Sequence, residues 1–378
     1  MDVLLSWLSH WQGAVAVVLV LGGLIFFHEL GHFSVARLFG IGVRTFSLGF
    51  GPKLWGKQVG KTEYRLSLVP LGGYVSMVGE DGEEEDPEVL ARDASNNVTF
   101  DSSESFAFRP AWQRMLVVLA GPVANIVLAF LIYWGVALFA GQSFLEPIIG
   151  TVVADSPAAR AELKPGDRIV QIDGKPLQEW SEVVEGIGAG QGQPVRLMLE
   201  RDEGRELVLL TTEITPEAKT RKNIFGEEKP AWLIGITASG TYGTRELGAV
   251  DALTTGFSQT WGMVSFTFES FKKLFERVVP LDQVGGPILI AQMVGQQAEY
   301  GVTGVLLMAA LISVNLGILN LLPVPVLDGG HIMFALIEIV RRRPVTDGVR
   351  DFATKMGMML LLGLMLLATW NDLVRLFS

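Results

Sequence analysis

The chain has 378 residues, of which 49% are apolar and 19% charged, and its mean hydropathy is +0.38. This composition is typical of a membrane protein that carries a soluble part, and it excludes one large globular domain. The formal net charge of −10 argues against a nucleic-acid partner, and the absence of cysteine excludes a disulfide framework and thiolate metal ligands.

The first predicted element is an apolar stretch from about Ala14 to Leu38, long enough to span a bilayer as a helix. It contains His28-Glu29-Leu30-Gly31-His32. Two histidines four residues apart project from one face of a helix and can bind one divalent metal, usually zinc. Glu29 can reach a water molecule at the metal and accept its proton. A chance motif would leave three ionisable side chains in lipid, at a cost of about 2.5 kcal/mol or more each.

Between the first and second spans, the sequence predicts a β-hairpin. Tyr64–Met77 alternates apolar and polar residues and then turns at Gly72-Gly73. Its weakly polar faces favour a hairpin that dips towards the membrane, where irregular backbone persists only beside protein or a water cavity. An ordinary half-buried hairpin is the alternative. The second span follows at Met115–Phe139.

The segment 145–216 has a different character, with short strands, glycine-rich turns and balanced charge. Ser156 is expected to cap a helix whose first residue is Pro157. Leu163–Gly174 predicts a turn, a strand and a hairpin turn. This order resembles a PDZ domain, which binds an extended peptide by strand addition; another small β-rich domain is the alternative. The expected peptide-binding edge consists of Ile148, Ile149, Gly150 and Thr151.

Beyond this domain, Trp261–Val279 places apolar residues near helical period, with charged residues beside them. An amphipathic helix of this kind lies on the membrane surface or over an active site, or packs against the neighbouring domain. The sequence leaves these alternatives open.

The third apolar stretch, Val302–Val326, carries a polar motif and continues to about Val340. Within it, Pro323 and Pro325 prevent a continuous helix, so free carbonyls and Asp328 lie at membrane depth. Asp328 as an N-cap of the next helix is the alternative. However, an unpaired carboxylate there is costly, and the two histidines still lack a third ligand. Coordination of one zinc ion by Asp328 answers both problems. For His331 the sequence leaves two roles open: one beside the metal ligands and one at the membrane interface.

The fourth stretch, Met356–Asn371, is short, and the side chains of its flanking Lys355 and Asp372 can reach the interface. Basic residues gather between spans one and two and between spans three and four, so the positive-inside rule makes both loops cytoplasmic. The N-terminus, the segment 140–300 and the C-terminus are then periplasmic in a bacterium.

These elements predict a polytopic α-helical membrane protein with four transmembrane helices, a membrane-associated β-hairpin and one inserted β-rich PDZ domain. Its expected parts are an N-terminal membrane half (1–144), the PDZ domain (145–216), a segment with the amphipathic helix (217–300) and a C-terminal membrane half (301–378).

Four motifs together resemble those of the site-2 proteases, which are intramembrane zinc metalloproteases: H-E-L-G-H, P-L-G-G-Y, A-G-P-x-A-N (120–125) and N-x-x-P-x-P-x-L-D-G. The chain is most similar to the RseP-type members, regulators of sigma-E in the envelope stress response, and the resemblance covers nearly its whole length. It implies one zinc ion on His28, His32 and Asp328, with Glu29 as the base. Substrate is then expected beside Asn320, Pro323 and Pro325, and along the hairpin at Leu71, Gly72 and Gly73.

The resemblance also implies a place in the bacterial inner membrane, and single-span membrane proteins, already trimmed on their outer side, as substrates. Anti-sigma factors and leftover signal peptides are among these. One PDZ domain instead of the two of enterobacterial members leaves the exact substrate open. Two other function classes remain: a catalytically inactive membrane PDZ scaffold, and a metal transporter, for which one polar constellation is a poor conduit.

Overall fold

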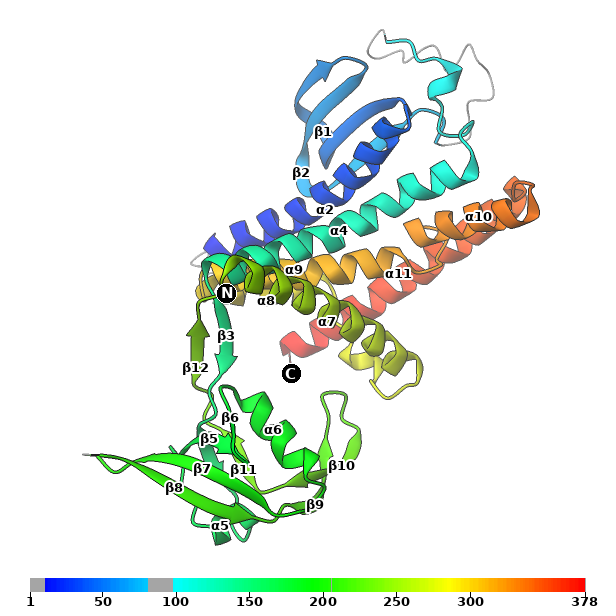
Figure 1. The fold of residues 1–378 in the computed structure, drawn as a ribbon. Helices are drawn as coiled ribbons and strands as arrows, with labels where there is room; N and C mark the ends of the chain where they lie inside the picture. The colour runs from blue at the N-terminus through cyan, green and yellow to red at the C-terminus, as the bar shows by residue number, and fades with distance from the viewer. Residues whose placement is uncertain (1–10, 81–97, 205, 378) are drawn as a thin grey trace. The chain divides into compact units, whose positions relative to one another are not determined.

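The computed structural model describes residues 11–80, 98–204 and 206–377, which form two compact units (Figure 1). The first unit comprises the chain up to Val136, together with Leu253–Lys272 and the residues from Pro280 onward. The second comprises Ala137–Ala252 and Lys273–Val279. It therefore holds the range 145–216 predicted for the PDZ domain, together with residues on either side of that range.

Four helices of the first unit are long and apolar enough to cross a membrane, as the sequence predicts. They are α2 (Trp11–Leu38), α4 (Ala111–Phe139), α9 (Val302–Asn320) and α11 (Asp347–Phe377). The fourth is longer than its apolar stretch, because the polar residues that precede Met356 continue the helix. Small residues let the helices approach closely. A Cβ on Gly31 of α2 would lie 2.3 Å from the carbonyl oxygen of Ala120 in α4.

The third span breaks where its prolines predict. Helix α9 ends at Asn320, and α10 (Asp328–Arg341) begins after an irregular segment that contains both prolines. Pro325 packs closely against two glycines. A Cβ added to Gly330 would lie 2.4 Å from the Cα of Pro325, and a Cβ added to Gly357 would lie 3.2 Å from the Cδ of Pro325. The glycines therefore let the segment fold back over the start of α10.

Two further helices complete the described part of the first unit. They are α8 (Pro287–Glu299), which packs on α2 and α9, and most of α7 (Ala249–Phe275). Met263 and Phe271 of α7 pack against buried residues of α4 and α9. Thr267 Oγ1 donates a hydrogen bond of 2.7 Å to Asn315 Oδ1 of α9. The predicted amphipathic helix thus packs on the spans of its own unit.

The fourth span ends in a buried carboxylate. Asp372 accepts hydrogen bonds from the N–H groups of Gly286 (2.9 Å), Ile288 and Leu289 (both 3.0 Å) at the start of α8. Its side chain is 1% exposed. The prediction that Asp372 reaches the membrane interface is therefore wrong, because the unpaired N–H groups of a first helical turn bind the carboxylate instead.

Strands β1 (Val43–Val59) and β2 (Thr62–Met77) form the predicted hairpin, but its turn lies elsewhere. The two strands are joined at Gly60-Lys61, where Gly60 has a φ of +61°. The predicted turn at Gly72-Gly73 is wrong, since both residues belong to β2. A Cβ on Gly72 would lie 1.8 Å from the Phe50 ring, so close packing explains this glycine.

Two stretches of β2 pair with the same part of β1, on its opposite sides. Residues 45–48 have strand partners on both sides, namely residues 63–66 on one side and residues 73–76 on the other. Within the described residues, the far side of Gly73–Met77 has no strand partner. This stretch is therefore an edge strand of the hairpin.

The second unit is a small α/β structure. Its core includes Ile169, Leu197 and Leu199, none more than 1% exposed. Ser156 caps the short helix α5, as predicted. The elements are β3 (Gln142–Leu145), β4 (Ile149–Val152), α5 (Pro157–Arg160), β5 (Arg168–Ile172), β6 (Lys175–Pro176), α6 (Trp180–Ala189), β7 (Val195–Asp202), β8 (Leu207–Ile214), β9 (Glu217–Lys222), β10 (Glu228–Leu233), β11 (Ile236–Ala238) and β12 (Tyr242–Arg245).

The sheets of this unit join strands that are distant in sequence. The order β6-β5-β7-β8 makes the main sheet, while β4 pairs with β11 and β3 pairs with β12. The β3–β12 ladder runs from the pair Leu145–Tyr242 to the pair Gln142–Arg245. The chain therefore enters and leaves the unit side by side.

Candidate metal centre

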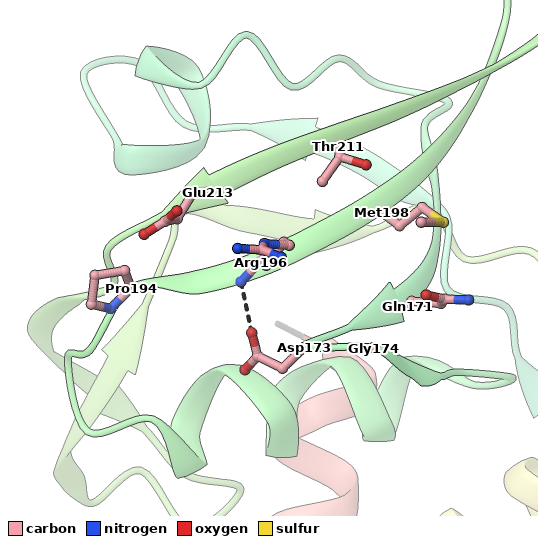
Figure 2. A pocket seen from close by; sticks show the side chains of 8 residues that line it. All are labelled: Gln171, Asp173, Gly174, Pro194, Arg196, Met198, Thr211 and Glu213. Carbon is pink, nitrogen blue, oxygen red and sulfur yellow. Dashed lines mark hydrogen bonds between the residues drawn. The ribbon is translucent and has the colours of Figure 1, made fainter.

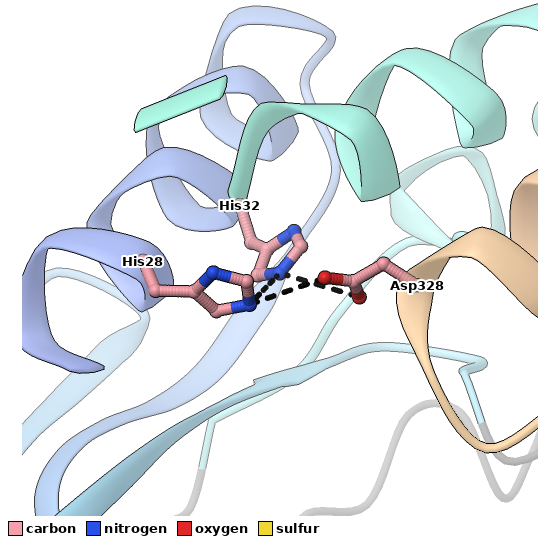
Figure 3. A group of neighbouring side chains, drawn as sticks. All are labelled: His28, His32 and Asp328. Carbon is pink, nitrogen blue, oxygen red and sulfur yellow. Dashed lines mark hydrogen bonds and ion pairs between the residues drawn. The ribbon is translucent and has the colours of Figure 1, made fainter. Parts of the chain in front are cut away.

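Three candidate metal ligands from two distant parts of the first unit meet at one point (Figure 3). His28 Nε2 lies 3.2 Å from His32 Nε2 and 3.1 Å from Asp328 Oδ2. His32 Nε2 lies 3.6 Å from Asp328 Oδ1. Both imidazoles are buried on α2, and the carboxylate comes from the first residue of α10.

These distances fit one tetrahedral zinc ion. Two ligand atoms, each about 2.0–2.1 Å from the ion, lie about 3.3 Å apart at the tetrahedral angle. Asp328 Oδ2 is buried without a hydrogen-bond partner, so a cation is the ligand it lacks. The capping alternative for Asp328 does not apply, since Leu327 is the N-cap residue of α10 and no side chain caps this helix.

The outer nitrogens of both imidazoles are held by α4. His32 Nδ1 lies 2.9 Å from the carbonyl oxygen of Val117, so it carries the proton and leaves Nε2 as the acceptor. His28 Nδ1 lies 3.2 Å from the side-chain amide of Asn125, which is fully buried. Asn125 Oδ1 has no partner. Rotating the amide brings this oxygen to His28 Nδ1 and gives both atoms a partner.

A glycine of α4 provides the space for both rings. A Cβ on Gly121 would lie 2.3 Å from His32 Nε2 and 2.9 Å from His28 Cε1. Gly121 and Asn125 belong to the A-G-P-x-A-N motif, to which the sequence alone assigns no chemical role. Gly121 is apolar, and the polar Asn125 in an apolar span indicates only that its amide has a hydrogen-bond partner, so the sequence alone does not connect either residue with the histidines.

Glu29 lies between the metal ligands and the edge strand. It lines a cavity of about 220 Å³ together with His28, His32 and Asp328. Val75 of β2 lines the same cavity. A Cβ on Gly73 would lie 3.5 Å from Glu29 Cγ, so the edge strand passes directly beside this side chain.

Some of the residues predicted to bind substrate lie close to the metal centre, and others do not. Asn320 Nδ2, at the end of α9, lies 3.4 Å from His28 Nε2. Pro323 is exposed, and Pro325 packs beneath α10. Gly72 and Gly73 belong to β2 near Glu29, whereas the side chain of Leu71 lies outside the described part of the structure.

In the second unit, the predicted peptide edge has partners on both sides. Strand β4 pairs with β11 on one side, while the Ile149 N–H donates to the Asp167 carbonyl on the other. Strand β11 instead borders a cavity of about 460 Å³. Its wall includes Val183 and Ile187 of α6 and Trp232 of β10. Within the described residues, β11 has β4 as its one strand partner, and it lies beyond residue 216.

A second hollow of the same unit, about 480 Å³, lies over the main sheet (Figure 2). Asp173 Oδ1 there accepts a hydrogen bond of 2.9 Å from the Arg196 N–H. Its wall mixes charged, polar and apolar side chains from β5, β7 and β8 without a cluster of metal ligands or a buried nucleophile among the described residues. We assign it no function.

Comparison with known proteins gives a consistent result. Residues 16–364 match peptidase family M50. The regulator of sigma-E protease RseP of Salmonella typhimurium is 33% identical over 466 positions, covering 98% of this chain and 100% of the relative. The zinc metalloprotease RasP of Bacillus licheniformis is 31% identical, covering 96% and 99%. A solved PDZ domain of an SdrC-like protein from Listeria monocytogenes is 26% identical with a TM-score of 0.18, covering 24% of this chain and 84% of that one.

Proposed function

This chain belongs to peptidase family M50 and is a zinc metalloprotease, and from that premise we propose that it hydrolyses peptide bonds within the membrane-spanning segments of single-span proteins. The observation that carries the proposal is the meeting of His28, His32 and Asp328 around one point, with both histidines on a helix apolar enough to span a bilayer. An ionisable cluster in such a helix is functional by default.

Zinc, when held by these three residues, supplies Lewis-acid polarisation of the scissile carbonyl and a lowered pKa for water. Glu29 accepts the proton from water and returns it to the leaving amine. The Asn320 amide, beside His28, donates a hydrogen bond to a carbonyl oxygen freed from the substrate helix. The α4 contacts keep both imidazoles oriented throughout.

A substrate helix must unwind before it is cleaved, because its carbonyls are hydrogen-bonded and its backbone is covered by side chains. The edge strand Gly73–Met77 can pair with the opened segment by strand addition. Pairing there places the opened segment beside Glu29, because the edge strand passes next to this side chain.

The lipid bilayer is the second partner in this proposal. Large apolar side chains on the outer part of the hairpin are exposed, among them Leu54, Trp55 and Leu68. An apolar patch of this kind on a hairpin between two spans supports its insertion towards the membrane. The basic loops between spans one and two and between spans three and four then face the cytoplasm of a bacterium.

The second unit, as a PDZ-like domain on the periplasmic side, controls access rather than chemistry. It contributes none of the ligands. The apolar cavity between α6 and β11 suits an extended peptide end. Partial obstruction of bulky outer domains then restricts cleavage to trimmed single-span proteins, such as an anti-sigma factor or a remnant signal peptide.

The test is the Glu29→Gln variant, compared with wild type on a panel of single-span peptides. The variant keeps one zinc ion per chain but loses cleavage, since a general base contributes about 10²–10⁴-fold. Turnover within about tenfold of wild type would remove Glu29 from the mechanism. A zinc-loaded wild type that cleaves no peptide would favour the inactive scaffold instead.

A further inference from the structure

The metal cavity adjoins a second cavity in the first unit. The metal cavity measures about 220 Å³ and its neighbour about 270 Å³, and both are lined by Phe106, Val118, His331 and Arg350. Arg350 lies near the start of α11, so this helix closes the junction. Ligand pockets usually measure roughly 300–1,000 Å³. In a cavity this small, a group bound beside the metal ligands lies close to Arg350.

Arg350 differs from its neighbour Arg114 in having no acceptor. Arg114 donates to Glu338 Oε1 at 2.7 Å and to the Arg109 carbonyl at 3.1 Å. None of the hydrogen bonds and ion pairs among the described residues involves the Arg350 guanidinium, although this residue is half-buried. Of the two carboxylates that line the second cavity, Glu338 is already engaged by Arg114, and Asp347 forms no hydrogen bond or ion pair with Arg350 among the described residues. The guanidinium is therefore available to a ligand.

Charge makes a carboxylate the suitable ligand. Among the described residues that line the metal cavity, Arg350 is the one Arg or Lys, and the other charged groups are the carboxylates of Glu29, Glu80 and Asp328. A guanidinium binds a carboxylate through two parallel N–H···O bonds. The carboxylates of the cavity repel an anion, whereas the guanidinium and a zinc ion on the three ligands attract it, so a carboxylate in this cavity is favoured between the ion and Arg350.

Hydrolysis in the metal cavity produces such an anion. The amide C–N bond breaks, the oxygen of water adds to the carbonyl carbon, and the proton from water passes through Glu29 to the leaving amine. The N-terminal fragment then carries a new carboxylate. We propose that Arg350 binds this carboxylate and holds the N-terminal cleavage product at the junction of the two cavities. This inference rests on the proposed function.

The test measures equilibrium binding of a labelled product peptide to the zinc-loaded full chain. Two probes are compared, identical except that one ends in a free carboxylate and the other in an amide. We expect Arg350→Gln to lose roughly tenfold to a hundredfold in affinity for the carboxylate probe, with little change for the amide. Arg350→Lys keeps part of the preference, since it retains the charge without the planar fork. Lys355→Gln, an exposed cation on the same helix, serves as the control and binds as wild type does.

Unchanged carboxylate binding by a zinc-loaded Arg350→Gln variant would overturn the inference, as would an equal loss for both probes. A third comparison uses intact substrates with Glu or Gln beside the scissile bond. If Arg350→Gln raises KM only for the Glu substrate and leaves the product probes unaffected, the guanidinium recognises a side chain and the product assignment is wrong. Because binding needs no turnover, a wild type that prefers the carboxylate probe but cleaves nothing would overturn the proposed function and keep the carboxylate site.

Discussion

At the metal centre, the second span supplies no ligand, yet it determines how two ligands are presented. The Val117 carbonyl and the Asn125 side chain hold the outer nitrogens of the imidazoles, while Gly121 leaves room for the rings. Orientation of a ligating histidine through its second nitrogen raises its basicity and fixes its tautomer. Two variants on α4 separate these contributions.

The first variant is Gly121→Ala. Its added methyl group would lie 2.3 Å from His32 Nε2, so the rings must move. We expect zinc affinity, measured by chelator competition, to fall by about tenfold or more while helix content stays constant. Gly135→Ala on the same helix is the matched control, because nothing lies within 4 Å of its Cβ position. Wild-type zinc affinity in Gly121→Ala would show that the rings do not need this space.

The second pair of variants changes Asn125. Asn125→Ala removes the acceptor for His28 Nδ1, and we expect a loss of roughly 10–100-fold in zinc affinity. Asn125→Asp keeps an acceptor and makes it anionic, so it retains zinc better than the alanine variant does. Equal zinc affinities of the alanine and aspartate variants would remove Asn125 from the positioning of His28.

At the scale of elements, the second unit depends on one buried ion pair. Arg201 donates to both carboxylate oxygens of Asp167 at 2.8 Å, and Asp167 also caps the Lys164 N–H. Burial alone would raise the pKa of Asp167, but these hydrogen bonds outweigh it and the pKa lies below its ordinary value. The stabilisation is therefore complete above the unfolded pKa of about 3.9 and disappears as the pH falls through the lower folded pKa.

We expect Asp167→Asn to destabilise the second unit by about 3 kcal/mol at neutral pH, because it leaves a partly buried guanidinium without its counter-charge. Hydrogen-exchange protection of the β5 and β7 amides in the full chain measures this loss of stability. The difference in protection between the variant and wild type narrows towards acid pH. Glu217→Gln breaks the exposed pair with Arg160 and is expected to leave the same protection unchanged. A difference that stays constant from neutral to acid pH would exclude the ion pair as its cause.

Elements with a strong local signal could be predicted from the sequence. The spans follow from uninterrupted apolar runs, and the break after Asn320 follows from two prolines. Asp372 could not be predicted, since its partners are N–H groups 83 to 86 positions away. Likewise, the partner of β4 is β11, whose short sequence carries no sign of this pairing. Local pattern identifies an element, whereas long-range pairing determines its neighbours.

At the scale of the whole molecule, the β3–β12 ladder allows most of the second unit to be excised. Leu145 and Tyr242 are paired, so an Asn-Gly turn can join them in place of residues 146–241. We expect the shortened protein to bind zinc and to cleave a short trimmed peptide within about tenfold of wild type, a change in barrier of about 1.4 kcal/mol. A folded, zinc-loaded but inactive product would make the second unit integral to catalysis.

The same excision distinguishes two ways of controlling access. Obstruction predicts faster cleavage of a substrate that retains a folded outer domain. Recruitment through the cavity beside β11 predicts slower cleavage of a trimmed substrate. We expect the first outcome. A rate for the untrimmed substrate that does not rise would contradict obstruction.

Under the proposed function, the edge strand beside Glu29 affects which membrane proteins this protease cleaves. Strand addition engages backbone N–H and C=O groups, which nearly all residues share. Under the proposed function, a protease whose edge strand pairs with the opened segment distinguishes segments by how readily they leave the helical state, rather than by a consensus sequence. Membrane proteins with stable helices are then spared inside the same bilayer. Among segments freed of their outer domains, those with helix-weakening glycine, proline or asparagine are degraded first.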